Sequence, residues 1–346
     1  MKELAVIIGR FQPVHNGHIE LIKFAQSQAK ELLILIGSAN VAPNIDNPFG
    51  WITRTELIES SLRLNDEEDY QHIFFHPIED NLYNENDWLI QVQEAVAIHT
   101  KDFGISDKDV VLVGHKKDNS SYYLNNFPQW GYQDFGQITV HSSTHIREFM
   151  YQHRLSYAGG HIPDFVFNFL SNFELTQEGK RLKEEYEHID KYKRQFAAYP
   201  YPPIFVTVDA VVIYEGHVLL VKRRAHPGKG LWALPGGFLN QDETVVTGIK
   251  RELMEETGLR AAVDVRCVKV FDAPKRSLRG RTITHAGLVR IPMYGGRFEN
   301  NLPRVKGSDD AEKAKWFSLL EVKKMNRELF EDHYSIILSM IDIDQV

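Results

Sequence analysis

The feature that constrains this chain most is the stretch over residues 237–259, where glycines and charged residues stand at fixed intervals. Its second half predicts a helix, because residues 247–256 are good helix formers apart from Gly248, and Gly258 suits a left-handed C-cap. Three carboxylates stand at i, i+3 and i+4 of that helix and therefore share one face: Glu252, Glu255 and Glu256.

Like charges on one helix face are unfavourable in water unless something neutralises them. A hard divalent cation such as Mg²⁺ does so with oxygen ligands, Mn²⁺ suits the same ligands, and pyrophosphate oxygens complete the shell. The turn before the helix ends in Gly236 and Gly237, which let the backbone approach a phosphate closely. The alternative is a solvated acidic face, a common role for runs of charge.

The rest of the spacing favours the metal site, because Gly237, Glu243, Arg251 and Gly258 also stand in register with the glutamates. The stretch resembles the Nudix box, G-x5-E-x7-R-E-U-x-E-E-x-G-U with U aliphatic, at each defined position. The resemblance implies metal-assisted cleavage of a nucleoside diphosphate linked to another group, with the three helix glutamates as metal ligands and catalytic residues. It also implies that Glu243 supports the site and that Arg251 ties the helix to its acidic neighbours.

A run of cations follows the box, within residues 272–281 and between two predicted strands at 263–271 and 281–291. These cations either meet a diphosphate or belong to a plain solvated loop. On the first interpretation, the residues that bind the diphosphate substrate would be Gly236, Gly237, Arg276 and Arg279.

At the start of the chain, residues 4–9 form a short aliphatic run that predicts a buried strand. A helical pattern follows from residue 19, and a second strand is expected at 32–37, so the opening predicts a β-loop-α-β unit of a parallel sheet. Ligands of such sheets lie at the carboxyl ends of the strands. The loop at that end contains Gly9, Arg10, Phe11, His15, Gly17 and His18.

His15 and His18 stand at the start of the predicted helix, where amide groups and the helix dipole favour anions. Two imidazoles there can donate hydrogen bonds to phosphate oxygens as charge develops, whereas a lone histidine pair is more often structural. The segment GRFQPVHNGH resembles the H-x-G-H nucleotidyltransferases, most closely the archaeal-type nicotinamide-mononucleotide (NMN) adenylyltransferases. The resemblance implies that His15 and His18 polarise the phosphates of ATP, and that Gly9, Arg10, Phe11 and Gly17 surround the nucleotide.

Three further residues inherit roles with NMN from this resemblance. Arg54 follows an Asn-Pro-Phe segment and would contact phosphate, although an ordinary surface arginine at a helix start fits equally well. Asp80 and Trp88 follow a predicted strand at 73–76 and would hold the nicotinamide riboside, with the ring stacked on indole. Trp88 is equally often plain core.

A second nucleotide-binding edge follows a strand predicted at 109–113, where Gly114 opens a polar loop. After a strand expected at 138–140, residues 142–147 match the second signature of the superfamily, S-[ST]-T-x-x-R. Ser142 and Thr144 would bind the triphosphate of ATP, and Arg147 would meet its developing charge. The alternative is an ordinary helix N-cap box.

Composition bounds the remaining choices. A chain of 346 residues favours two domains, and the net charge of −7 gives no reason to expect nucleic acid as a partner. The single cysteine, Cys267, excludes an intramolecular disulfide, and no apolar run is long enough for a membrane span. We therefore expect a soluble, cytoplasmic protein without a membrane partner. Proline-rich residues 199–203 predict a stiff junction between domains.

Taken together, the motifs resemble the bifunctional NMN adenylyltransferase/Nudix hydrolase (ADP-ribose pyrophosphatase) family. The resemblance implies an α/β fold: a Rossmann-like nucleotidyltransferase domain with a parallel sheet over residues 1–185, a connecting helix end and linker over 186–202, and a Nudix α/β/α sandwich with a mixed sheet over 203–346. The implied reactions join NMN and ATP into NAD⁺ and pyrophosphate, and hydrolyse ADP-ribose to AMP and ribose 5-phosphate, both with Mg²⁺.

Other readings stay open at this point. The second domain could be a Nudix-like sensor that binds ADP-ribose or NAD without cutting it, or a hydrolase of another nucleoside diphosphate derivative. The first domain could transfer a nucleotide to another phosphate ester. The sequence leaves open the oligomeric state, including a homo-oligomer, the domain orientation, the acceptance of nicotinic acid mononucleotide and the general base of hydrolysis.

Overall fold

The protein is described by a computed structural model that covers residues 1–63, 72–115, 126–136, 142–259, 263–291, 298–299, 301–308 and 311–344. The chain forms two compact units, Met1–Glu184 and Glu185–Val346. The division falls inside helix α6 (Gln177–Arg194), so the expected linker over residues 186–202 begins within a helix. The functional limits of the two domains stay a prediction.

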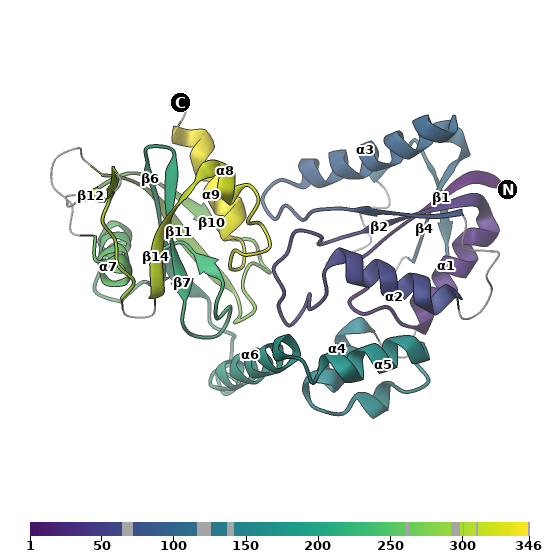
Figure 1. Ribbon diagram of the computed structural model, residues 1–346, viewed down its shortest axis with the longest axis horizontal. Coiled ribbons are helices and arrows are strands. Elements are labelled where there is room, and N and C mark those ends of the chain that lie inside the picture. Colours follow the sequence, from purple (N-terminus) through teal and green to yellow (C-terminus); the bar gives the residue numbers. More distant parts are fainter. Residues whose placement is uncertain are drawn as a thin grey trace. The chain divides into compact units, whose positions relative to one another are not determined.

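Unit 1 is built on a parallel sheet, five-stranded among the described residues, in the order β3-β2-β1-β4-β5 (Figure 1). The four strands predicted at 4–9, 32–37, 73–76 and 109–113 are confirmed as β1 to β4, and β5 was not expected; the strand predicted at 138–140 lies outside the described residues. In chain order the elements are β1 (Lys2–Gly9), α1 (Asn16–Gln28), β2 (Ala29–Ile36), α2 (Trp51–Arg63), β3 (Ile73–Pro77), α3 (Glu85–Phe103), a 3-10 turn (Asp107–Asp109), β4 (Val110–Gly114), β5 (Gly131–Asp134), α4 (Ser143–Tyr151), a 3-10 turn (Leu155–Ala158), α5 (Asp164–Phe173) and the start of α6.

The alternation of side chains along the strands places helices on both faces of this sheet. Leu4 and Val6 of β1 share a buried cluster with Val92 and Val96 of α3, whereas α1 and α2 cover the opposite face (Figure 1). The strand order reverses its direction of growth between β1 and β4. The carboxyl ends of these two strands, Gly9 and Gly114, therefore flank the crevice where sheets of this kind bind ligands.

Unit 2 contains a mixed sheet, seven-stranded over the part of the chain that is described. Its main path is β10-β11-β6-β7-β14, with β8 beside β7 and β9 beside β6; β11 pairs parallel with β6, and the other pairs are antiparallel. The elements are β6 (Phe205–Tyr214), β7 (His217–Arg223), β8 (Trp232–Ala233), β9 (Gly236–Phe238), α7 (Val245–Thr257), β10 (Asp264–Phe271), β11 (Thr282–Arg290), the separate pair β12 (Phe298–Glu299) and β13 (Leu302–Pro303), β14 (Ala311–Ser318), α8 (Leu319–Val322) and α9 (His333–Asp344).

Local sequence explains most of this unit. The predicted hairpin turn at Glu215 and Gly216 is confirmed, with φ angles of 45° and 71° that fit a primed turn. Helix α7 buries Ile249 and Leu253 against the sheet, while α9 lies on the other side of the strands (Figure 1). Strand β14 was not predicted. Within the described part of the chain, no helix combines the length and the apolar character that crossing a membrane requires.

The predicted C-cap of α7 is also confirmed, because Gly258 has φ 65° and donates its N–H to the carbonyl of Met254. A Cβ at this position would meet little, the nearest atom being the carbonyl oxygen of Lys306 at 3.9 Å. A substitution there therefore tests backbone conformation alone.

We predict that Gly258→Ala lowers the stability of unit 2 by about 1 kcal/mol, because the Cβ of alanine makes the left-handed conformation unfavourable. Gly258→Asn should lose less, since asparagine tolerates that region. Scanning calorimetry measures both, with an expected fall of a few °C for alanine. Equal losses for the two variants would contradict this account of the cap.

Candidate active sites

In unit 1, His15 and His18 lie together where β1 gives way to α1. His15 is the N-cap of α1 in extended conformation, and its backbone N–H donates to Nδ1 of His18 at 3.3 Å. The two rings stack with centroids 3.7 Å apart, and Phe11 meets His18 edge-on at 4.8 Å. The sequence pattern therefore places both imidazoles at the positive end of a helix dipole and in a fixed mutual geometry.

The loop that carries these histidines is tied to its neighbours by buried hydrogen bonds. The side chain of Gln12 donates to the carbonyl of Phe49 at 2.8 Å and accepts from its N–H at 3.1 Å. From the other side, the Ser143 hydroxyl donates to the carbonyl of Pro13 at 2.9 Å. The two signatures that are far apart in sequence thus meet at one place in unit 1.

Arg147 is the buried cation at that meeting point, with only 4% of its surface exposed. It donates to the carbonyl of Gln12 at 2.7 Å and pairs with Asp46 at 3.1 Å. Burial lowers its pKa and Asp46 raises it, while the nearby charge of Arg10 lowers it further. Arg10 and Arg147 therefore contribute to one positive field beside the histidines.

Arg54 occupies a different position from the one its predicted role suggests. It is 1% exposed, and its guanidinium donates to the carbonyls of Arg10 at 2.7 Å, Gly37 at 2.6 Å and Ser38 at 3.3 Å. These bonds hold the carboxyl ends of β1 and β2 together, so the surface-arginine alternative is wrong. A direct contact between Arg54 and phosphate stays a prediction.

The other residues predicted around the nucleotides lie near the carboxyl edge or at helix starts. Asp80 follows β3 and accepts the Ser38 hydroxyl at 2.6 Å. Trp88 lies in the first turn of α3, half-buried, and packs against the core of unit 1, so its stacking role stays a prediction.

The remaining residues predicted to bind ATP lie at helix starts and strand ends. Ser142 caps α4 and Thr144 lies 3.4 Å from Arg147. Gly9, Gly17 and Gly114 lie at the end of β1, in the first turn of α1 and at the end of β4; the polar loop after residue 115 lies outside the described residues as far as 125.

In unit 2, the two glycines of β9 make room for carboxylates. A Cβ on Gly236 would lie 2.3 Å from the carbonyl oxygen of Val208 and 2.4 Å from Oδ1 of Asp209. A Cβ on Gly237 would lie 2.5 Å from Oε1 of Glu252. We expected these glycines to admit a phosphate, and the structure adds a second reason for them, the close approach of the protein's own acidic groups.

Arg251 organises the acidic residues around α7, as the sequence predicts. It bonds to Glu243 at 2.7 and 2.9 Å, to Glu252 at 2.8 Å and to Glu255 at 2.9 Å. A further bond to the carbonyl of Phe238, at 3.1 Å, ties α7 to β9. One guanidinium therefore fixes the helix, the strand and three carboxylates together.

The charged forms of Glu252 and Glu256 are disfavoured by the surrounding protein. Glu256 is 8% exposed and accepts the Gly236 N–H at 3.0 Å, and burial raises its pKa to about 8. Burial also raises the pKa of Glu252. Within the described residues, no three histidine, cysteine or acidic side chains converge as a ready metal cage. The half-buried Glu252 and the buried Glu256 nevertheless fit a divalent cation by their chemistry, because a hard cation stabilises two such carboxylates in their charged form.

A cavity beside Glu256 collects the other residues predicted to bind ADP-ribose. Its lining includes Gly236, Gly237, Glu256, Arg276 and Arg279. Arg276 is buried and makes a two-pronged pair with Asp332 at 2.7 and 2.8 Å, so a solvated loop is the wrong interpretation for this residue. Arg279 lies 3.9 Å from Glu331 and is the more accessible of the two cations.

Sequence reasoning missed several residues of the cavity, among them Asp209, Glu331 and His333. Nδ1 of His333 accepts the Leu234 N–H at 2.8 Å, and its Nε2 lies 3.9 Å from Asp209, which accepts the Thr284 hydroxyl at 2.5 Å. A signal existed for Asp209, which is the only charged residue of β6. The segment 331–333 carries three consecutive charged or titratable residues, but no local pattern ties it to the box.

The comparisons with known proteins agree with this geometry. A cytidylyltransferase-like family model matches residues 6–149, and a NUDIX domain model matches residues 203–339. The fold and the two sites thus define a nucleotidyltransferase domain joined to a Nudix domain, a class that implies a divalent metal.

Similarity to individual proteins is more specific. The chain is 34% identical to a nicotinamide/nicotinic acid mononucleotide adenylyltransferase of Acinetobacter baylyi, over 54% of this chain and 94% of that protein. It is also 34% identical to an ADP-ribose pyrophosphatase of Methanocaldococcus jannaschii, over 48% of this chain and 88% of that protein. The crystal structure of a bifunctional NMN adenylyltransferase/ADP ribose pyrophosphatase from Francisella tularensis matches 99% of both chains, with 38% identity and a TM-score of 0.87; a further structure of it holds AMP and a Mn ion. The chain belongs to this bifunctional NMN adenylyltransferase/ADP-ribose pyrophosphatase family.

The buried imidazole of His333 generates a prediction about acid stability. Burial lowers its pKa to about 3, whereas an exposed histidine in the unfolded chain titrates near 6.5. Between these values the unfolded state binds a proton that the folded state does not, so stability falls as the pH falls. His333→Asn keeps an acceptor for the Leu234 N–H but cannot titrate.

We expect wild type to lose about 1.5 kcal/mol more than His333→Asn between pH 6.5 and pH 5. In scanning calorimetry this is a difference of about 4 °C in the pH-dependent fall of Tm. Parallel pH dependence of the two proteins would show that folding does not lower the pKa of His333.

Proposed function

We propose that this chain is a bifunctional enzyme of NAD metabolism. One site transfers the adenylyl group of ATP to NMN, giving NAD⁺ and pyrophosphate. The other hydrolyses ADP-ribose to AMP and ribose 5-phosphate. The observation that carries the proposal is that each compact unit contains its own set of the residues predicted to act, alongside a whole-chain likeness to a bifunctional relative. ATP, NMN and ADP-ribose are the small-molecule partners, and a reducing cytoplasm suits the single cysteine.

In unit 1, positioning and charge stabilisation account for the chemistry. The phosphates of ATP lie against the start of α1, where His15 and His18 donate hydrogen bonds, and the cations Arg10 and Arg147 complete the positive field. A phosphate oxygen of NMN attacks the α-phosphorus and pyrophosphate leaves, so no side-chain nucleophile is needed. The buried bonds of Gln12 and Arg54 keep the loop ordered before substrate arrives.

In unit 2, Glu252 and Glu256 would hold the divalent cation, with Glu255 as a further ligand. The cation, Mg²⁺ with Mn²⁺ as a substitute, supplies neutralisation of the diphosphate and activation of water when bound. Arg251 holds Glu252 in place, and the missing side chain of Gly237 lets that carboxylate lie against the strand. Arg279 lines the same cavity and would meet the diphosphate.

Two substitutions separate the activities. His18→Ala should reduce NAD⁺ synthesis at least a hundredfold and leave ADP-ribose hydrolysis unchanged. Glu256→Gln should do the reverse, because it removes a charged ligand of the cation. Both rates are measured on each purified full-length variant.

The exposed residues His72 and Glu312 provide matched controls, since His72→Ala and Glu312→Gln make the same chemical changes away from both sites. Loss of both activities in either active-site variant would refute the independence of the sites. Synthesis near the wild-type rate in His18→Ala would refute the role of that histidine.

A glycine pair tests the architecture of the hydrolase site. Gly237→Ala should reduce hydrolysis about a hundredfold with little change in Tm, because the new methyl group displaces the carboxylate at the end of the Glu252 side chain and leaves the backbone in place. Gly236→Ala should lower Tm by several °C, because its methyl group meets the fixed carbonyl of Val208. We therefore expect Gly237→Ala to lose mainly activity and Gly236→Ala to lose mainly stability. Equal losses of activity and of Tm in the two variants would contradict this account.

A further inference from the structure

The cavity of unit 2 has an aromatic wall that cleavage of a diphosphate does not require. Phe238, Phe330 and His333 line the cavity. Phe330 is 4% exposed and His333 is 5% exposed, whereas Phe238 is 42% exposed. Among the described residues that line the cavity, Phe238 is therefore the one aromatic ring that offers a substantial free face to a ligand.

The ring of Phe238 packs against other aromatic rings of unit 2. Phe205 meets it edge-to-face, with centroids 5.9 Å apart and planes at 66°, and Phe205 in turn contacts Phe196 and Tyr192 at 5.2 and 5.5 Å. The backbone of Phe238 is fixed as well, because β9 pairs with β6 and Arg251 donates to its carbonyl. A ring held in this way loses little freedom when a flat group stacks on it.

A cation accompanies the exposed ring. The guanidinium carbon of Arg279 lies 5.4 Å from the ring centroid of Phe238, which is within the range of a cation–π contact. Both residues line the cavity that contains Glu256. A ligand that carries a flat base and a diphosphate matches this pair, since the base can stack on phenyl and the phosphate can meet the guanidinium.

The cavity itself places the ring near the acidic groups. Gly236 and Phe238 face the same side of β9, where a Cβ on Gly236 would meet Asp209, whereas Gly237 between them faces the carboxylate of Glu252 on the other side. Phe238, Asp209 and Glu256 line the same cavity. One nucleoside diphosphate in that cavity can therefore contact both the ring and the acidic groups.

We propose that Phe238, with Arg279 beside it, is the platform on which the purine base of the nucleoside diphosphate substrate stacks, and that it sets the preference of the hydrolase for substrates that carry a base. The inference rests on the proposed hydrolysis of ADP-ribose and deepens it, because it assigns a residue to substrate choice. Phe238 then contributes to binding and leaves the chemical step to the carboxylates.

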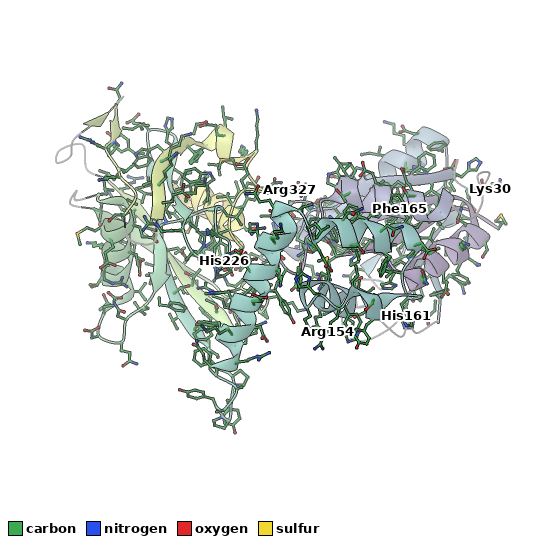
Figure 2. All side chains as sticks on the ribbon, turned by 60° about the horizontal axis from the view of Figure 1, so that its bottom comes forward. Lys30, Arg154, His161, Phe165, His226 and Arg327 are labelled. Carbon is green, nitrogen blue, oxygen red and sulfur yellow. The ribbon has the colours of Figure 1, made fainter. Side chains whose placement is uncertain are left out.

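The test uses the full-length enzyme and Phe238→Leu, which keeps the volume approximately and removes the flat face. We expect KM for ADP-ribose to rise about tenfold, with kcat within about twofold, because stacking on an aromatic side chain contributes to binding by this order. Phe238→Trp should restore a KM near wild type. The matched control is Phe165→Leu: Phe165 is 41% exposed and lies on α5 of unit 1 (Figure 2), and its replacement should change nothing in hydrolysis.

A substrate without a base, P1,P2-di(5-ribosyl) diphosphate, provides the second arm. Phe238→Leu should leave the KM for this compound unchanged. An equal rise of KM for both substrates, or a fall in kcat for ADP-ribose with KM unchanged, would overturn the platform. Calorimetric Kd values for ADP-ribose separate this inference from the proposed function: a tenfold weaker Kd in Phe238→Leu supports the platform even if wild type does not hydrolyse ADP-ribose, and an unchanged Kd overturns it.

Discussion

The burial of two carboxylates against a strand is the constraint on which unit 2 depends. Glu252 approaches β9 because Gly237 leaves room for it, and Glu256 accepts the N–H of Gly236; burial raises the pKa of both carboxyls. Buried charge of one sign is costly without a partner. The guanidinium of Arg251 is shared among Glu243, Glu252 and Glu255, and the charge of Arg223 only partly offsets the effect of burial on Glu256. The charged carboxylates therefore lack enough neighbouring positive charge, which a divalent cation would supply. Cation binding and catalytic geometry depend on the same feature.

Unit 1 positions its nucleotide loop with hydrogen bonds to backbone groups, several of them donated by the buried guanidiniums of Arg54 and Arg147. Its nucleotide loop must present two imidazoles at the start of a helix, yet a loop of this length has few internal contacts. Gln12 and Arg54 bind carbonyls and an N–H of the surrounding segments, and Arg147 reaches the same loop from α4. The loop is consequently ordered by residues from distant parts of the unit. Positioning of this kind suits a reaction in which the substrate supplies the nucleophile.

Much of this account was accessible from sequence because the two main motifs are local. The box fixes its helix, its C-cap at Gly258 and the three glutamates within one short stretch, and the β-loop-α-β pattern fixes the histidine loop. The residues that sequence reasoning missed or misjudged act across the chain. Asp209 and His333 meet through a fold contact between β6 and α9, and Arg276 is buried only because Asp332 faces it. Strands β5 and β14 were missed, since no motif marks them.

The central claim is that the two units perform two linked reactions of one metabolite family. The most direct test is a hydrolysis panel on the purified full-length protein: ADP-ribose, NADH, diadenosine polyphosphates and nucleoside triphosphates, each with Mg²⁺ and with Mn²⁺. The account predicts a clear preference for ADP-ribose, with AMP and ribose 5-phosphate as products and no turnover after chelation of the metal. Tight binding of ADP-ribose without cleavage of any member of the panel would contradict it and would make unit 2 a sensor.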